Sequence, residues 1–102
     1  MEDLKQQLLD DTIRGVKEKE EEIEKSNKEI EFLEARVKVE KRFFELKDIK
    51  EEMKEDVKYS LQALESMVMM EKERNSELRK ESELLRVRKQ VINMFESEDF
   101  RY

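Results

Sequence analysis

The sequence lacks cysteine, histidine and proline, and it has a single glycine, Gly15. Without cysteine there is no disulfide and no thiolate metal site. Without histidine the commonest general base and a common zinc ligand are missing. No glycine-rich phosphate loop is present either. We therefore expect a protein that is not an enzyme, with no catalytic residue, no bound metal, no cofactor and no small-molecule substrate.

Long apolar segments are also missing. The longest apolar run covers residues 67–70, far short of the roughly 20 residues that a membrane-spanning helix needs. The first four residues, Met1 to Leu4, include two acidic residues and no basic one, so the start does not resemble a secretory signal. We therefore expect no membrane span, and we expect a soluble intracellular protein of the cytoplasm or nucleus.

Charged residues make up 49% of the chain, with 22 basic and 28 acidic side chains, while hydrophobic residues make up 36%. A globular domain normally needs more apolar residues to offset the entropy of the chain. Two interpretations remain, a disordered charged chain or a helix that buries a narrow apolar stripe against another helix. The lack of proline and the abundance of Glu, Lys, Leu and Arg favour the helix.

Apolar residues in the first half of the chain recur every seven positions, as in a coiled coil. We assign this row to heptad position d, and the residue four positions later to position a. Position d holds Leu9, Val16, Ile23, Ile30, Val37 and Phe44, and position a holds Ile13, Glu20, Asn27, Glu34 and Lys41. Because position a is mostly polar, this seam depends on its neighbours for stability.

The second half has its own row with the same period, which implies a left-handed supercoil. This row consists of Val57, Leu64, Glu71, Leu78, Leu85 and Ile92. Its partner row, four positions later, consists of Leu61, Val68, Asn75, Ser82 and Lys89. Phe44 and Val57 are thirteen residues apart, one short of two heptads, so we predict a phase change near residues 44–57. With no proline or glycine there, we expect the helix to continue without a turn.

The predicted fold is therefore all-α, with one continuous coiled-coil helix over residues 1–97 and a short C-terminal tail at 98–102. Asn27 and Asn75 both fall at position a, where a buried Asn fixes the register and pairs most readily in a parallel dimer. A parallel homodimer is the leading prediction. β-Branched residues at position d disfavour parallel dimers, so an antiparallel dimer and an antiparallel four-helix assembly centred on residues 43–70 are the alternatives.

The middle of the chain carries more apolar residues than a two-stranded seam covers. Neighbouring apolar residues point in different directions around a helix, and methionine suits adaptable contacts. The predicted partner face consists of Phe43, Leu46, Ile49, Met53, Met67, Met69 and Met70, with Phe95 near the C-terminus. The competing interpretation is ordinary partial exposure of scattered apolar residues.

These features indicate a structural oligomerisation or scaffold module that pairs with itself and spaces or joins parts of a larger assembly. That assembly would be cytoskeletal, centrosomal, tethering or chromosome-associated. The alternative is an adaptor whose central apolar face or C-terminal end binds a different protein, such as another coiled-coil protein. The basic residues of 72–89 are interrupted by glutamates, whereas a DNA-binding zipper has a nearly acid-free basic helix. This argues against a nucleic-acid partner.

Overall fold

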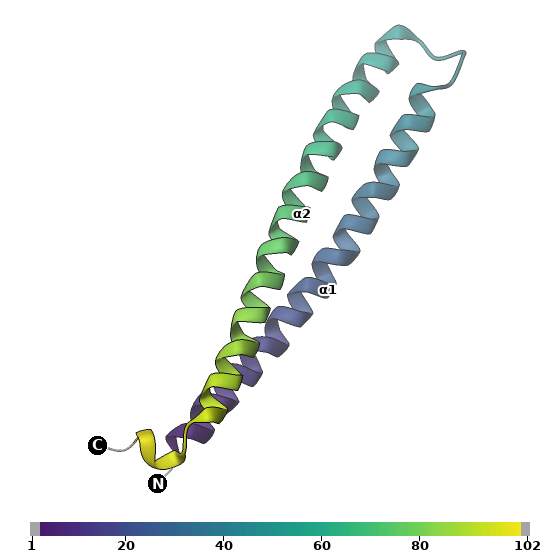
Figure 1. Cartoon of the computed structure of the whole chain (residues 1–102). Helices are drawn as coiled ribbons and strands as arrows, with labels where there is room; N and C mark the ends of the chain where they lie inside the picture. Colours follow the sequence, from purple (N-terminus) through teal and green to yellow (C-terminus); the bar gives the residue numbers. More distant parts are fainter. Residues whose placement is uncertain (1–2, 101–102) are drawn as a thin grey trace. The chain divides into compact units, whose positions relative to one another are not determined.

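The computed structural model describes residues 3–100, which form two long α-helices and one short 3-10 helix (Figure 1). Helix α1 spans Leu4–Phe44, helix α2 spans Glu51–Met94, and the 3-10 helix η1 spans Ser97–Phe100. The prediction of an all-α fold is confirmed for this part of the chain. The expected tail at 98–102 begins inside η1, and its last two residues lie outside the described ones.

The expected single continuous helix is wrong, because the helix is interrupted over residues 45–50, called the turn below. At the end of α1, the amide of Leu46 donates to the carbonyl of Phe43 at 3.2 Å, so the last turn tightens. Acidic Glu51 and Glu52 then open α2, where they favour a helix N-terminus. The interruption falls within the predicted phase change.

Packing explains a turn that the local sequence did not predict. No described residue adopts a positive φ, so the chain reverses through ordinary backbone conformations, without the glycine or proline that usually mark a turn. The halves of the chain each carry an apolar stripe. Reversal of the chain buries these stripes against each other within one molecule, and such packing outweighs the helix propensity of the turn residues.

The described residues divide into two units, which are considered separately. The turn unit, residues 25–75, is a helical hairpin made of the second half of α1, the turn and the first half of α2. The terminal unit combines residues 3–24 of the first half of α1 with residues 76–100 of the second half of α2 and η1.

Contacts in the terminal unit define an antiparallel helix pair. The hydroxyl of Ser97 donates to the carboxylate of Asp3 at 2.8 Å, and the ammonium of Lys19 lies 2.8 Å from the carboxylate of Glu81. Residue numbers therefore rise along α1 as they fall along α2. The rings of Phe95 and Phe100 lie 5.4 Å apart, which packs η1 onto the end of α2.

The core positions of α1 differ by one residue from the predicted seam. The predicted row is half-buried from Leu9 to Val37, whereas its last member, Phe44, is 43% exposed and does not belong to the core. The partner row lies three residues later instead of four. That row consists of Thr12, Lys19, Ser26, Leu33 and Glu40, of which Thr12, Ser26 and Leu33 are buried. Ile13, placed at position a by the sequence, is 47% exposed. The apolar row is therefore position a, and the partner row is position d.

The core positions of α2 coincide with the rows found in the sequence. Val57, Leu64, Asn75, Leu78 and Ser82 are buried, Leu61, Val68, Glu71, Leu85 and Ile92 are half-buried, and Lys89 is exposed. The structure places these side chains against α1 of the same chain instead of against an identical helix. The buried apolar core of the described residues is small, consisting of Leu33, Val57, Leu64 and Leu78.

Gly15 provides a test of this helix packing. A Cβ atom at Gly15 would lie 3.2 Å from the Cδ1 atom of Leu85, so the half-buried tip of Leu85 must shift slightly. Alanine is favoured over glycine inside a helix by about 0.5–1 kcal/mol. We expect Gly15→Ala to raise the free energy of unfolding by about 0.5 kcal/mol in urea titrations followed by circular dichroism.

Gly15→Val is the matched control, because its branched side chain adds bulk at the same contact and has a lower helix propensity. It should lower the free energy of unfolding. A loss of stability in Gly15→Ala as large as in Gly15→Val would contradict this packing.

Candidate functional site

A buried polar layer joins the two helices at the end of the turn unit that lies farthest from the turn. The side-chain amide of Asn75 donates to the hydroxyl of Ser26 at 3.0 Å and to the side-chain oxygen of Asn27 at 2.9 Å. Ser26 and Asn75 are 1% and 7% exposed. Sliding one helix along the other would leave these groups buried without partners, at a cost of about 1–3 kcal/mol each. The layer therefore fixes the antiparallel register.

This layer removes the sequence argument for a parallel dimer. That argument assumed that Asn27 and Asn75 each face their own copy in a second chain. Instead, the two residues bind each other within one chain, and Asn27 lies at the edge of the interface. The buried asparagine does fix a register, as expected, but the register is that of α1 against α2 of the same chain.

Ion pairs line one edge of each unit. In the turn unit, Lys72 lies 3.1 Å from Glu34, and Lys41 lies 3.9 Å from Glu65. In the terminal unit, Glu20 pairs with Arg86. Glu20, Glu34 and Lys41 belong to the row that the sequence placed at position a, so this row forms a charged border. Such exposed pairs contribute roughly 0.2–1 kcal/mol each.

Lys19 of the terminal unit pairs with Glu81. The hydrogen bond to the Glu81 carboxylate raises the pKa of Lys19 above its ordinary value, and burial opposes this change more weakly. Because the pKa of the lysine is raised on folding, the pair stabilises the fold at neutral pH. This contribution disappears only as the pH rises through the raised pKa of the lysine.

An apolar stripe runs along α1 on the exposed side of the turn unit. Phe32, Val39 and Phe43 are spaced by seven and four residues, which places them on one side of a helix. They are 59%, 65% and 38% exposed. The guanidinium of Arg36, between them in sequence, lies 5.9 Å from the centre of the Phe32 ring. This cation–π contact lays the charged side chain of Arg36 beside the stripe.

A second stripe runs along α2 of the same unit. Met67 and Met70, 45% and 67% exposed, directly precede the core positions Val68 and Glu71. Phe32 likewise directly precedes the core residue Leu33. A two-fold axis perpendicular to the helices relates the members of an antiparallel pair, so equivalent positions lie on the same face. The stripes of α1 and α2 therefore share one face of the hairpin.

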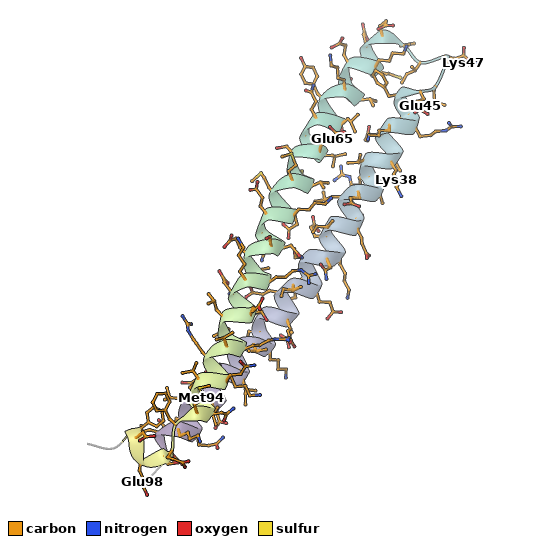
Figure 2. All side chains as sticks on the ribbon, viewed as in Figure 1. Lys38, Glu45, Lys47, Glu65, Met94 and Glu98 are labelled. Atoms are coloured by element: carbon orange, nitrogen blue, oxygen red, sulfur yellow. The ribbon has the colours of Figure 1, made fainter. Side chains whose placement is uncertain are left out.

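The stripes meet at the turn, where Lys47 and Glu45 are labelled in Figure 2. Phe43, Leu46, Ile49 and Met53 line a common hollow of about 390 Å³ there. Leu46 and Met53 are 50% and 48% exposed. Phe32, Val39, Phe43, Leu46, Met53, Met67 and Met70, together with half-buried Ile49, are called the apolar face below.

The structure brings together most of the predicted partner residues but not all. Met69 is 65% exposed, yet it lies about 100° around the helix from Met70 and outside the apolar face. Phe95 belongs to the terminal unit, where it packs on Phe100. Sequence reasoning missed Phe32 and Val39. Their spacing from Phe43 is a helical signal, but it becomes visible only when the core row is assigned correctly.

The terminal unit carries its own exposed apolar stripe on α2. Leu84, Val87 and Val91 are spaced by three and four residues and are 55%, 47% and 45% exposed. This stripe is shorter than the apolar face, and none of these three residues is aromatic.

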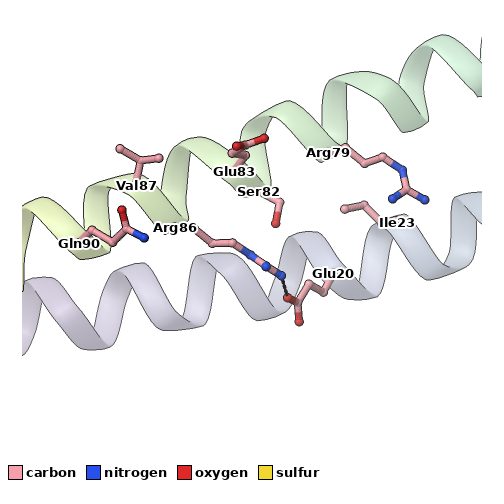
Figure 3. Close-up of a pocket in the computed structure, with 8 residues that line it drawn as sticks. All are labelled: Glu20, Ile23, Arg79, Ser82, Glu83, Arg86, Val87 and Gln90. Carbon is pink, nitrogen blue, oxygen red and sulfur yellow. Dashed lines mark hydrogen bonds and ion pairs between the residues drawn. The ribbon is translucent and has the colours of Figure 1, made fainter.

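A separate groove of about 580 Å³ in this unit is bordered by polar and charged side chains (Figure 3). Arg86 reaches across the groove to its ion-pair partner Glu20 in the same view. The other residues that line it are Ile23, Arg79, Ser82, Glu83, Val87 and Gln90.

Among the helices of residues 3–100, none combines the length and the apolar character needed to cross a lipid bilayer. In that part of the chain, acidic side chains form no cluster of three suited to hold a metal ion. Comparison of the sequence and structure with protein-family models, curated proteins and solved structures finds no match.

Removing the Asn75 amide tests the polar layer. Asn75→Ala leaves the buried Ser26 hydroxyl without its partner, so we expect the free energy of unfolding to fall by about 1–2 kcal/mol in urea titrations. Asn93→Ala, at an exposed position of α2, is the control and should change it by less than about 0.5 kcal/mol. Equal effects of the two substitutions would mean that the layer does not hold the helices in register.

Proposed function

We propose that this chain is a structural assembly module in which two copies associate through the apolar faces of their turn units. Four helical segments would then pack around a shared core, which is the four-helix arrangement centred on residues 43–70. The module would join or space parts of an intracellular assembly, cytoplasmic or nuclear. The observation that carries the proposal is the apolar face itself.

The size of the apolar face supports this proposal. Seven of its side chains are between 38% and 67% exposed. At roughly 100 Å² each they present about 700 Å² per copy, close to the ~800 Å² that each partner buries in a standard stable interface. Monomeric proteins rarely expose apolar patches of this size unless the patch is used for binding.

The small internal core supports it further. The buried apolar side chains of the described residues are three leucines and one valine, few for a chain of 102 residues. A two-helix hairpin buries one stripe per helix, and the second stripe on each helix stays in solvent. Packing on a second copy would bury the second stripe and add to the stability of the fold.

Self-pairing also suits the symmetry of the face. Because α1 and α2 each contribute an equivalent stripe, the face is close to two-fold symmetric along the hairpin. Most soluble homodimers use one patch on both subunits in a two-fold arrangement. The charged border with Lys41, Glu34 and Lys72 lies on the other side of the helix pair, where it would remain in solvent and oppose stacking into larger aggregates.

An adaptor that binds a different protein is the second candidate, favoured by the three methionines of the face. Met53, Met67 and Met70 provide flexible side chains that adapt to helices of different sequence. In this case, an amphipathic helix of the partner would lie in the groove between the two stripes.

Two adjacent methionines provide a matched test. Met70 and Met69 are equally exposed, at 67% and 65%, but only Met70 lies on the apolar face. We expect Met70→Glu to raise the dissociation constant of the dimer at least about tenfold, because it buries an unpaired carboxylate. Met69→Glu should change it less than about twofold. Sedimentation equilibrium over a range of concentrations provides both values.

The same measurements separate the two candidates. Equal loss of association in both variants would mean that the apolar face is not the interface. A wild-type chain that stays a folded monomer at every concentration would contradict self-pairing. If that monomer also binds an apolar dye, and Met70→Glu reduces the binding, the adaptor becomes the better explanation.

A further inference from the structure

We infer that two copies of this chain also exchange helices, with the turn straightened and α2 of each copy packed antiparallel on α1 of the other. The exchanged dimer uses the interface between α1 and α2, not the apolar face, and thus goes beyond the proposed function. It rests on the composition of the turn, the phase of the core rows and the direction of the contacts.

The turn is compatible with a continuous helix. Residues 45–50 include Glu45, Leu46, Lys47 and Lys50, all good helix formers, and neither glycine nor proline. At the two ends of the turn, the amide of Glu45 donates to the carbonyl of Lys41 and the amide of Lys54 to that of Lys50. These are the i to i−4 bonds of an α-helix, so a straightened turn extends a pattern that is already present.

One core row keeps its phase across the turn. Leu33 and Leu61 are both core residues, and the 28 residues from 33 to 61 are four complete heptads. Of the three positions of this row between them, Glu40 and Lys54 are half-buried, and Lys47 is exposed in the turn. The phase change near 44–57 affects the other row alone. A continuous helix would therefore present the core rows of α1 and α2 on nearly the same side.

Contacts between α1 and α2 survive the exchange. The helix pairs are antiparallel in both units, so an antiparallel dimer brings the same residues together from different chains. Asn75 would bind Ser26 and Asn27 of the other copy, and Lys19 would pair with Glu81 of the other copy. The balance between the hairpin and the exchanged dimer is then set by the turn and by protein concentration.

Energy transfer within one chain distinguishes the exchanged dimer from the hairpin. The sequence has no cysteine, so Gln6→Cys with Asn93→Cys places two dyes on exposed positions of the terminal unit. A trace of doubly labelled chain is refolded with excess unlabelled chain, and monomer and dimer are separated by size-exclusion chromatography. In a continuous helix the two positions lie about 130 Å apart.

We expect high transfer in the monomer and near-background transfer in the exchanged dimer. A dimer joined through the apolar faces would keep high transfer and would be lost in Met70→Glu, whereas the exchanged dimer would keep its low transfer in that variant. The failure of this inference is thereby distinguishable from failure of the proposed function.

Turn variants move the balance in opposite directions. Lys47→Gly with Asp48→Gly disfavours a helical turn and should lower the proportion of exchanged dimer at least about tenfold. Asp48→Ala with Ile49→Ala favours it and should raise the proportion by about tenfold. Dimers that all retain high transfer within each chain, or turn variants with unchanged proportions, would overturn the inference.

Discussion

The hydrogen bonds of Asn75 to Ser26 and Asn27 are the interaction on which the arrangement of this chain depends. The helices carry few large apolar core residues, so apolar packing alone would tolerate several registers. A buried amide with two hydrogen-bond partners tolerates only one register, because any other register would leave it without these partners. By fixing which residues of α1 and α2 face each other, this layer determines which side chains remain outside the pair. The apolar face exists because the register places Phe32, Met67 and Met70 there.

The two sides of the turn unit differ in a way that is relevant to assembly. One side is bordered by Glu34, Lys41, Lys72 and Glu65, which pair with each other and stay hydrated. The other side is lined with aromatic residues and methionines. A helix pair with one polar and one apolar side has a defined direction for further packing. In the proposed dimer, this asymmetry would limit the size of the assembly and favour a closed pair of hairpins over open aggregation.

Much of the helical content was predictable from the sequence, and the chain reversal was not. Absence of proline, a single glycine and a seven-residue apolar period lead directly to long helices and to the core rows of α2. The break between Phe44 and Glu51 carries no local signal, because the residues of the turn are themselves helix formers. It follows from the advantage of burying both stripes within one chain, which is a property of the whole fold.

The candidate site was predictable in part for the same reason. Excess apolar residues near the turn, among them Phe43, Leu46 and Met53, stand out in the sequence. Phe32 and Val39 were missed because the row of α1 was assigned to the wrong heptad position, which left Leu33 out of the predicted seam. Small side chains at Thr12 and Ser26 hid the true partner row, since neither residue has the apolar character expected of a core.

We propose that a second copy of the chain covers the apolar face. This proposal is tested most directly by nuclear magnetic resonance of the methionine methyl groups as a function of protein concentration. We expect the signals of Met53, Met67 and Met70 to shift as dimers form, while those of Met69 and Met94 stay in place. Signals that all remain unchanged, or a shift of Met69 as large as that of Met70, would contradict it.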